Sequence, residues 1–373
     1  MELMNKKHKY WERMCEIKKE SINNQFLINN EPILDYEIPD NIKCEVLHPL
    51  TMNGMNCDNI SDELRSDIIN FIGTNDCMDS GNITEISIET FNRFLLIPSF
   101  IGILYDRNKI IGTMFTIIIR SHVRKINEDI MTSYTTFLCI DKNYRNRGLA
   151  MILIKSIMKE GYDRYKINHG YYMTTEKHHN INNKLESWYR PINIEKAKSA
   201  GFTLESFRKE KDSVKSIKLR QRLGYNIAKP KKIPRKVVME DYNKILPILQ
   251  KGEIYMNPSI EEFGFMCKFF DMYIVEDDEC SIFGLFPMTS VISSTGKRIY
   301  NANLAFMMGD IISGALWIAK ENGYDILYGW CWGDITHTKV QKVRGLITIE
   351  EVYMEFYNSK NRILNNDFML PIF

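Results

Sequence analysis

The stretch FLCIDKNYRNRGLAMILIKSIMKEG (Phe137–Gly161) passes from an apolar run through a basic loop into a helical pattern. The run FLCI is bounded by polar residues, which is typical of a short buried strand. From Leu149 to Glu160 apolar residues recur at helical spacing, and Gly161 is a residue type that commonly ends a helix. The stretch therefore predicts a strand, a basic loop and a helix.

The loop RNRGLA (145–150) has the composition of an anion site. Gly148 permits close approach of the backbone, Arg145 and Arg147 supply positive charge, and Ala150 keeps the first helical turn small. A strand that leads through such a loop into a helix directs several free N–H groups at one place, which suits a phosphate. The loop thus predicts a pyrophosphate site. A solvated surface turn is the alternative, because basic turns before helices are common.

The same order of elements occurs twice in the chain. The first copy has the predicted strands FIGILY (100–105), IIGTMFTIII (110–119) and SYTTFLCI (133–140) before the helix. The second has the strands MYIVE (272–276), SIFGLFPM (281–288) and RIYNANLAFM (298–307), the helix GDIISGALWIAKENG (309–323) and the strand YDILYGW (324–330). We interpret this order as an internal duplication. The second loop, MMGDIIS, carries Asp310 and no arginine, so only the first copy is expected to bind phosphate.

Composition and charge restrict the class of protein. With 373 residues the chain exceeds what one hydrophobic core usually supports, which predicts two domains or one unusually large domain. A net charge of +2 gives no global field for nucleic acid, and we interpret the basic crossing at 208–236 as a linker, with a nucleic-acid patch as the alternative. Eight scattered cysteines indicate a reducing compartment and no structural zinc. Without a signal peptide or a span-length apolar run, we expect a cytoplasmic protein with no membrane span.

Two resemblances give the loop a specific ligand. RNRGLA resembles the Arg/Gln-x-x-Gly-x-Gly/Ala signature of the GNAT superfamily, which binds the pyrophosphate of acyl-coenzyme A. The longer FLCIDKNYRNRGLAMILIKSI, with SWYRPINIEKAKSAGF (187–202) and KHKYW (7–11), resembles the glycylpeptide N-tetradecanoyltransferase (N-myristoyltransferase) family. The resemblance implies an α/β fold of two tandem GNAT-like acyltransferase domains, with mixed, largely antiparallel sheets flanked by helices. Residues 1–220 would bind acyl-CoA, and residues 221–373 would complete the acceptor cleft.

The resemblance also implies which residues bind the coenzyme. They come from an N-terminal arm, the strand and the basic loop: Lys9, Tyr10, Trp11, Phe137, Leu138, Cys139, Ile140, Arg145, Asn146, Arg147, Gly148, Leu149 and Ala150. The family has serine in place of Asn146 and arginine in place of Gly148. This loop is therefore closer to the general GNAT form.

The implied reaction is transfer of a long acyl chain, tetradecanoyl in the family, from acyl-CoA to the N-terminal glycine amine of a protein. The main-chain amides of Phe137 and Leu138 would stabilise the oxyanion, and the terminal carboxylate of Phe373 would be the base. No nucleophile with a partnered histidine stands out, which favours direct attack on the thioester. His178 and His179 lack ligand spacing, so no metal is expected. The partners expected of this monomer are acyl-CoA and acceptor N-terminal peptides.

The acceptor side departs most from the family pattern. The segment GTNDCMDSGNITEISIETF (73–91) lacks the family's aromatic wall. Three tryptophans, Trp188, Trp330 and Trp332, could line an acceptor channel or pack in the core. Two alternatives therefore stay open. One is a GNAT acyltransferase that uses another acyl length or another amine. The other is a non-catalytic relative that binds acyl-CoA or peptide.

Overall fold

The computed structural model describes most of the chain. The described ranges are 27–28, 38–75, 83–167, 170–174, 184–199, 227–276, 280–288, 290–292, 296–309, 311–331, 334–336, 347–357, 359–360 and 368–371. Of the residues named above, Lys9, Tyr10, Trp11, His178, His179, Asp310, Trp332 and Phe373 lie outside these ranges.

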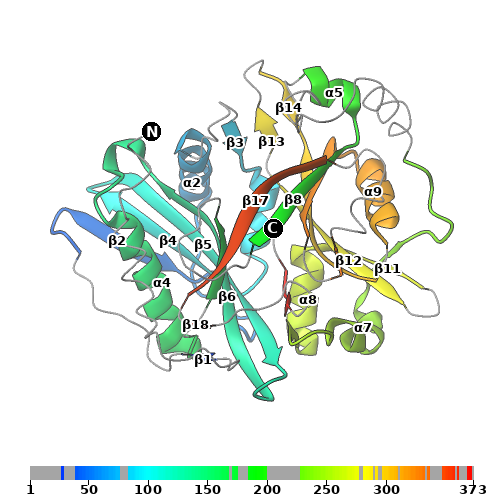
Figure 1. Cartoon of the computed structure of the whole chain (residues 1–373). Helices are drawn as coiled ribbons and strands as arrows, with labels where there is room; N and C mark the ends of the chain where they lie inside the picture. Colours follow the sequence, from blue (N-terminus) through cyan, green and yellow to red (C-terminus); the bar gives the residue numbers. More distant parts are fainter. Residues whose placement is uncertain are drawn as a thin grey trace.

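Fourteen of the described strands form one sheet (Figure 1). From the first half come β2 (Ile42–Leu47), β4 (Ser99–Asp106), β5 (Lys109–Val123), β6 (Glu128–Ile140), β7 (Gly170–Thr174) and β8 (Lys184–Pro191). From the second half come β9 (Arg235–Lys236), β10 (Ile254–Met256), β11 (Asp271–Val275), β12 (Ser281–Pro287), β15 (Asn301–Met308), β16 (Ile326–Trp330), β17 (Ile347–Tyr357) and β19 (Phe368–Met369). Among the described strand pairs of this sheet, only β6 with β7, β15 with β16 and β10 with β19 are parallel. The predicted mixed, largely antiparallel α/β fold is confirmed.

Helices cover the faces of the sheet, and short strands pair at its margins. The described helices are α2 (Asp62–Asn75), α3 (Ile88–Phe94), α4 (Leu149–Tyr165), α5 (Ile194–Ser199), α7 (Tyr242–Leu249), α8 (Ile260–Phe269) and α9 (Ile312–Glu321), with 3-10 turns η2 (Lys142–Tyr144) and η3 (Met239–Asp241). The marginal strands are β1 (Leu27–Ile28) with β18 (Ser359–Lys360), and β3 (Ile83–Glu85) with β13 (Ser290–Ile292) and β14 (Arg298–Ile299).

The internal duplication is confirmed by the strand pairing. In the first copy β4, β5 and β6 are antiparallel neighbours, α4 follows, and β7 returns parallel to β6. In the second copy β11, β12 and β15 are antiparallel neighbours, α9 follows, and β16 returns parallel to β15. The element order repeated in the sequence therefore reflects one topology used twice.

The two halves exchange strands across the sheet. β17 of the second half lies between β7 and β8 of the first, and Figure 1 shows β17 beside β8. β10 and β19 extend the sheet beside β5. The halves therefore share one continuous sheet in the described part of the chain. The domain boundary near residue 220 falls within 200–226, outside the described residues, and stays a prediction.

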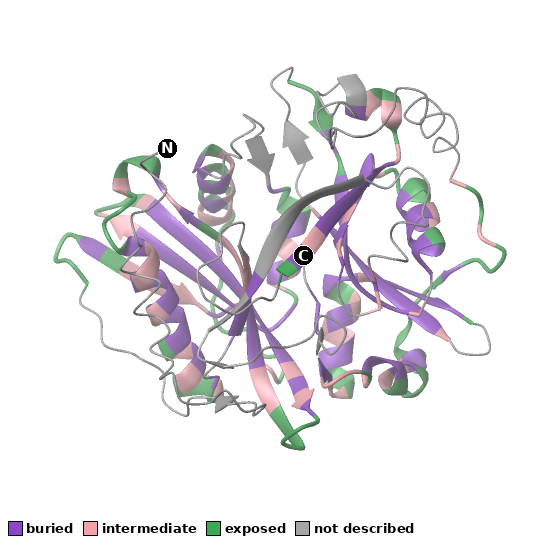
Figure 2. Cartoon of the chain, in the orientation of Figure 1, coloured by how far each residue is buried: buried purple, intermediate pink, exposed green. Residues whose placement is uncertain are grey.

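The core follows this shared sheet. Figure 2 shows the sheet strands mainly buried and the helices buried on their inner sides. The largest cluster contains a group of aromatic rings from both halves, in which Phe94 contacts Phe115, Phe269 and Phe286 at centroid distances of 5.0, 5.2 and 5.9 Å. Each fully buried phenylalanine contributes roughly 1.5 to 3 kcal/mol by burial. This cluster fixes α3 between the halves.

Helix α4 continues to Tyr165, five residues beyond the Glu160 that the sequence pattern predicts. Gly161 does not end it, because this residue is buried inside the helix and packs near Phe100 and Ile167. The helix ends at Lys166, which has φ +56°, and the N–H groups of Lys166 and Ile167 bond back to the carbonyls of Tyr162 and Gly161. A non-glycine residue here adopts the left-handed conformation that usually favours glycine.

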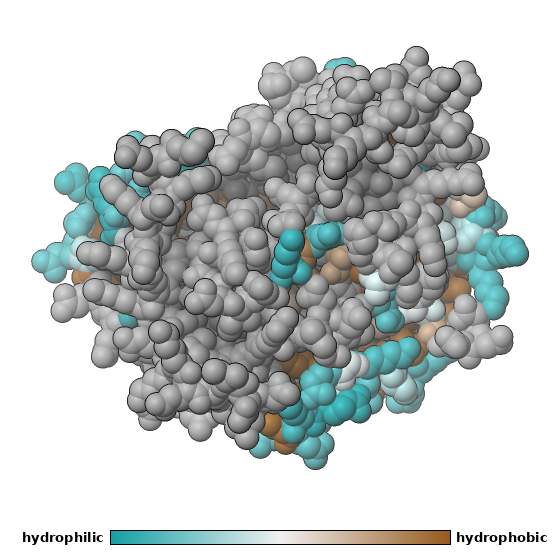
Figure 3. All heavy atoms as spheres, in the orientation of Figure 1, coloured by the Kyte–Doolittle hydropathy of each residue, from teal (hydrophilic) through white to brown (hydrophobic). Residues whose placement is uncertain are grey.

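The described surface is mainly hydrophilic at its rim. Figure 3 shows hydrophilic residues gathered along the left edge, where β2 lies, and along the lower right edge. Among the described residues no helix is long and apolar enough to cross a membrane.

Candidate active site

Strand β6 carries a β-bulge at the predicted catalytic residues. Its register against β5 shifts between Thr113 and Phe115, so that Phe137 and Leu138 have no paired residue in that ladder. Phe137 has φ +51°, a region that bulky residues rarely adopt. A bulge removes the extra residue from the ladder, which leaves its main-chain groups available to another partner.

The other edge of β6 also loses its neighbouring strand at this point. β6 and β7 pair in parallel only from Ser133 to Thr135, and β7 pairs with β17 on its far side. Beyond Thr135 no described strand pairs with that edge of β6. The bulge therefore lies where two parallel strands separate, a place where backbone donors can face a ligand.

The side chains around the bulge point in different directions. The ring of Phe137 contacts those of Phe94 and Phe115 at 5.9 and 5.7 Å, so this side chain anchors the bulge in the core. Leu138 is 38% exposed and Cys139 is 5% exposed. Ile140 is half-buried and packs against the cluster under α4. Of these residues, Leu138 offers the most surface to a ligand.

The basic loop leads from the bulge into α4 with two left-handed residues. Asn146 has φ +63°, and Gly148, at the N-cap of α4, has φ +77°. The first helical residue, Leu149, is buried, and no side chain caps the helix start. Left-handed residues of this kind turn successive N–H groups into one concave surface, and the helix dipole adds partial positive charge. This geometry suits a phosphate.

The two arginines of the loop have different surroundings. Arg145 donates from Nε to the carbonyl of Ile140 (3.1 Å) and from Nη2 to the carbonyl of Asn75 at the end of α2 (2.9 Å). Arg147 lies over the ring of Tyr144, 5.1 Å from its centroid. Arg145 therefore ties the loop to α2, whereas Arg147 is exposed and its guanidinium, over the half-buried ring of Tyr144, can reach a bound anion.

A second set of contacts fixes the start of the loop. Asp141 accepts hydrogen bonds from Lys109 Nζ (2.7 Å) and from the Asn143 N–H (2.9 Å), and Tyr144 donates to Asp106 (2.7 Å). The bond from Lys109 holds the pKa of Asp141 below its ordinary value, so this carboxyl stays charged. These contacts join the loop to the β4–β5 turn.

The second copy differs at the equivalent loop. Gly309 also has a positive φ (+98°), but its N–H donates to the Asp334 carboxylate at 2.8 Å. The Asp334 carboxylate therefore accepts a main-chain hydrogen bond that a phosphate would otherwise accept. This contact supports the prediction that only the first copy binds phosphate.

The described end of the chain lies beside the place where β6 and β7 separate. The Tyr171 hydroxyl donates to the carbonyl of Pro371 at 2.9 Å, and the ring of Tyr171 contacts that of Tyr134 on β6 at 4.9 Å. Burial raises the pKa of Tyr171 well above its ordinary value, so the phenol remains a donor. Leu370 is fully buried. The sequence analysis missed both tyrosines, because a tyrosine inside a strand has no pattern that separates it from ordinary core.

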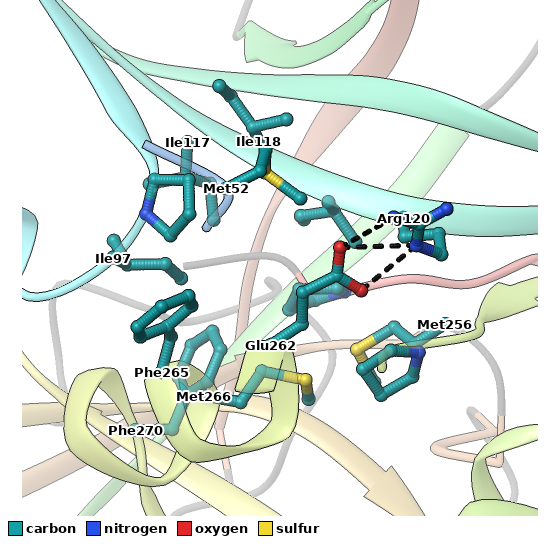
Figure 4. A pocket seen from close by; sticks show the side chains of 14 residues that line it. Met52, Ile97, Ile117, Ile118, Arg120, Met256, Glu262, Phe265, Met266 and Phe270 are labelled. Carbon is teal, nitrogen blue, oxygen red and sulfur yellow. Dashed lines mark hydrogen bonds and ion pairs between the residues drawn. The ribbon is translucent and has the colours of Figure 1, made fainter. Parts of the chain in front are cut away.

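A small pocket of about 30 Å³, partly open to solvent, adjoins this tail between the halves (Figure 4). Its apolar wall includes Ile97, Ile117, Phe265, Met266, Phe270 and Pro371. In Figure 4 the side chains of Arg120 and Glu262 point toward one another, and Arg120 bonds both carboxylate oxygens at 3.0 to 3.1 Å. Because Glu262 also accepts the Ser259 N–H at the start of α8, this pair fixes α8 to β5.

The two described tryptophans that were candidates for an acceptor channel pack against the core. Trp188 is fully buried in the cluster under α9, and Trp330 is half-buried against the main core. Within the described ranges no group of three metal-ligating side chains occurs.

Comparisons with known proteins show which proteins the chain is similar to. No family model matches the chain. It is 32% identical over 150 residues to the glycylpeptide N-tetradecanoyltransferase of Plasmodium falciparum, and 33% identical over 81 residues to a protein of Melanoplus sanguinipes entomopoxvirus that is provisionally given the same name. These matches cover 37% and 21% of this chain, and 36% and 26% of the relatives. The chain therefore matches about a third or less of each curated relative.

Solved structures extend the similarity to the whole fold. The crystal structure of Saccharomyces cerevisiae N-myristoyltransferase with bound myristoyl-CoA aligns with a TM-score of 0.74 at 15% identity, over 98% of this chain and 96% of that chain. A structure of the yeast enzyme with bound myristoyl-CoA and inhibitors aligns with a TM-score of 0.75 at 14% identity, over 98% of this chain and 94% of that chain. The resemblance seen in the sequence is confirmed: the chain is similar to glycylpeptide N-tetradecanoyltransferases over part of its sequence, and it has the N-myristoyltransferase fold.

Proposed function

We propose that the protein transfers a long acyl chain, tetradecanoyl by its relationship to the family, from acyl-CoA to the N-terminal glycine amine of other proteins. The observation that carries this proposal is the single segment Phe137–Leu149. At one end of this segment is a β-bulge whose residues have no partner in the ladder with β5, and at the other end is a helix N-terminus that suits a phosphate. The yeast enzyme with this fold binds myristoyl-CoA.

In the proposed donor site the pyrophosphate of the coenzyme binds at the helix start, and the thioester lies at the bulge. The N–H groups at Gly148 and Leu149, with Arg147, would bind the pyrophosphate. The acyl chain would lie against the strand residues, including Cys139 and Ile140. The arm residues Lys9, Tyr10 and Trp11 would cover the coenzyme.

In the proposed reaction the acceptor amine attacks the thioester carbon and the carbon–sulfur bond breaks. Negative charge develops on the carbonyl oxygen, where the amides of Phe137 and Leu138 would donate. In other acyl-transfer enzymes the loss of one such donor costs about 3 to 4 kcal/mol. The amine nitrogen gives its proton to a base, and the coenzyme leaves as a thiolate that takes up a proton. We assign the base to the terminal carboxylate of Phe373, two residues beyond the anchored Pro371.

Two observations support a second candidate, a transferase with a shorter acyl group. The rings of Phe94 and Phe115 pack directly against Phe137 on its core side, and the described cavity lies nearer the tail than the bulge. A tetradecanoyl chain on this side of Phe137 would need space that the rings of Phe94 and Phe115 now occupy. Acyl length is therefore the property to test first.

The test is turnover of tetradecanoyl-, octanoyl- and acetyl-CoA with a pool of glycine-starting peptides, read by mass spectrometry beside the affinity for each coenzyme. Tetradecanoyl modification at the glycine amine is the expected result. Preference for acetyl-CoA would establish the second candidate. Tight acyl-CoA binding with no modified peptide would identify a binding protein, and the proposal would fail.

Two further properties belong to the proposal. We expect the protein to act as a monomer in the cytoplasm on the N-termini of acceptor proteins. Size-exclusion chromatography with light scattering, and fractionation of cells, would test these points.

A further inference from the structure

Strand β15 of the second copy carries a β-bulge at the same place as strand β6 of the first. Its register against β12 shifts between Gly284 and Leu285, so that Ala305 has no paired residue in that ladder. The last parallel pair of β15 with β16 is at Asn303, two residues earlier. In the first copy Phe137 likewise follows the last parallel pair of β6 with β7 by two residues. Both halves therefore have a bulge beside the place where two parallel strands separate.

The two places differ in the ligand that each can bind. The N–H of Gly309 donates to the Asp334 carboxylate, so the loop of the second copy is not expected to bind phosphate. No described residue of β15 has a positive φ, whereas Phe137 has φ +51°, so the second bulge does not repeat the proposed oxyanion site. The ligand expected where β15 and β16 separate is therefore a neutral polar group.

Asn303 is a buried polar side chain at this second place. It is 2% exposed, and its Nδ2 has no hydrogen-bond partner among the described residues. Its cross-strand neighbour is Phe286, whose ring offers no carbonyl or hydroxyl acceptor. The equivalent residue of the first copy, Thr135, lies opposite Thr116, and their hydroxyl oxygens are 3.3 Å apart. A buried amide donor without a partner lowers stability, so its presence in Asn303 indicates a ligand that accepts the bond.

The two places face each other across β17. Through β7, the last parallel pair of β6 is level with Glu355 of β17, and through β16 and β8, that of β15 is level with Ile347. Beyond these pairs β6 runs antiparallel to β17 and β15 runs parallel to it, so each strand runs toward the level of the other pair. With five strand spacings and about six residues between them, Phe137 and Asn303 lie roughly 30 Å apart along the sheet.

An extended peptide fits this arrangement in length and in chemistry. Asn303 and the first bulge share a face of the sheet, because Phe286, opposite Asn303, and Phe137 both contact the ring of Phe94 at 5.9 Å. A peptide whose amine lies at the first bulge covers roughly 30 Å with about nine extended residues. Its main-chain carbonyls are neutral acceptors, and an asparagine amide can bond a peptide group through both its N–H and its C=O.

We propose that Asn303 is a specificity-determining residue for the acceptor, whose amide binds a main-chain carbonyl of the acceptor peptide several residues after the N-terminal amine. The inference rests on the proposed function, because that function places the acceptor amine at the first bulge. Asn303 contacts the substrate far from the reacting atoms. It therefore affects acceptor affinity and not the chemical step.

The test is Asn303→Leu, which keeps the approximate size of the side chain and removes its amide. For an acceptor of about ten residues we expect KM to rise roughly three- to ten-fold, with kcat and acyl-CoA affinity unchanged, because one hydrogen bond to the substrate is lost. For an acceptor of three residues, which spans roughly 10 Å, KM should stay unchanged. Urea unfolding should show no loss of stability, because the variant removes an unpaired donor.

The matched control is Asn322→Leu, the same substitution in the same half. The amide of Asn322 already donates to the Tyr273 hydroxyl at 3.1 Å. This control should lose stability in urea and keep the wild-type KM for both acceptors. Asn303→Ala gives the same comparison if the leucine side chain disturbs folding.

A second measurement tests the hydrogen bond itself. Peptides in which one carbonyl at a time is replaced by an alkene isostere should show one position whose loss of affinity in the wild type disappears in Asn303→Leu. An equal KM of the two proteins for the long acceptor, a similar rise for the short one, or losses that add at every position would overturn the inference and leave the proposed function standing. A wild type that modifies no glycine-starting peptide would refute the proposed function, and the inference with it.

Discussion

Replacement of Arg145 by alanine is expected to lower mainly the stability of the protein, whereas replacement of Arg147 is expected to lower mainly its affinity for acyl-CoA. Arg145→Ala loses two charged-donor hydrogen bonds to the carbonyls of Ile140 and Asn75. Such bonds contribute about 1.5 to 3 kcal/mol each when buried, and this side chain is exposed, so we expect a loss of about 1 to 2 kcal/mol of unfolding free energy. Acyl-CoA binding by Arg145→Ala should weaken only indirectly, through greater flexibility of the basic loop.

Arg147→Ala should leave stability nearly unchanged, because an exposed cation–π contact with Tyr144 contributes about 0.5 kcal/mol. It should lose one charge-assisted contact to the coenzyme, about 1.5 to 3 kcal/mol, which raises the dissociation constant roughly ten- to a hundred-fold. The loss should shrink at high salt, where screening weakens the wild-type contact.

The assay combines urea unfolding with calorimetric titration of acyl-CoA at low and high salt. Lys159→Ala, an exposed position on α4, controls for the loss of one positive charge. The reasoning is refuted if Arg147→Ala binds acyl-CoA like the wild type. It is also refuted if Arg145→Ala unfolds like the wild type while binding acyl-CoA as weakly as Arg147→Ala.

Three other changes test the site and its support. Gly148→Ala should cost about 1 to 2 kcal/mol in urea unfolding and weaken acyl-CoA binding, because φ is +77° while an added Cβ meets no atom within 4 Å; equal stability of the two proteins would contradict this. Thr113→Val should raise the unfolding free energy by about 1 kcal/mol, because its buried hydroxyl has no partner among the described residues; a loss in urea unfolding would mean that the hydroxyl is bonded. Burial lowers the pKa of His48 below 6.5, so the unfolded chain binds its proton more readily, and stability should be complete above about pH 6.5 and decrease below it. Urea unfolding at about pH 7.5 and about pH 5.5 should show a smaller pH effect in His48→Gln, and an equal effect would exclude His48 as the cause.

The sequence could predict those elements that rest on local patterns. β4, β5 and β6 have strong apolar runs, the polar turn at Arg107 and Asn108 separates the first two, and the loop before α4 has a recognisable composition. The repeated order of elements also predicted the internal duplication that the pairing of the second copy shows. These features depend on neighbours in the sequence, which a single chain displays directly.

Other features depend on distant partners and could not be predicted. Phe137 has no sequence sign of a positive φ, since bulky residues adopt it only where surrounding structure requires it. Nothing in the sequence distinguishes Arg145 from Arg147, because the carbonyl that binds Arg145 belongs to Asn75 on another helix. Gly161 seemed to end its helix because the contact with Phe100 is invisible in the sequence.

The position of β17 between β7 and β8 has a consequence for biosynthesis. During translation the chain emerges from its N-terminus at roughly 5 to 20 residues per second. β7 and β8 therefore wait for a strand that is synthesised long after them, and Tyr171 waits for Pro371, 200 positions later. Until then the nascent chain exposes unpaired strand edges, which are prone to aggregate. A chain truncated before β17 should thus depend on chaperones, even though it contains the whole segment from the bulge to α4.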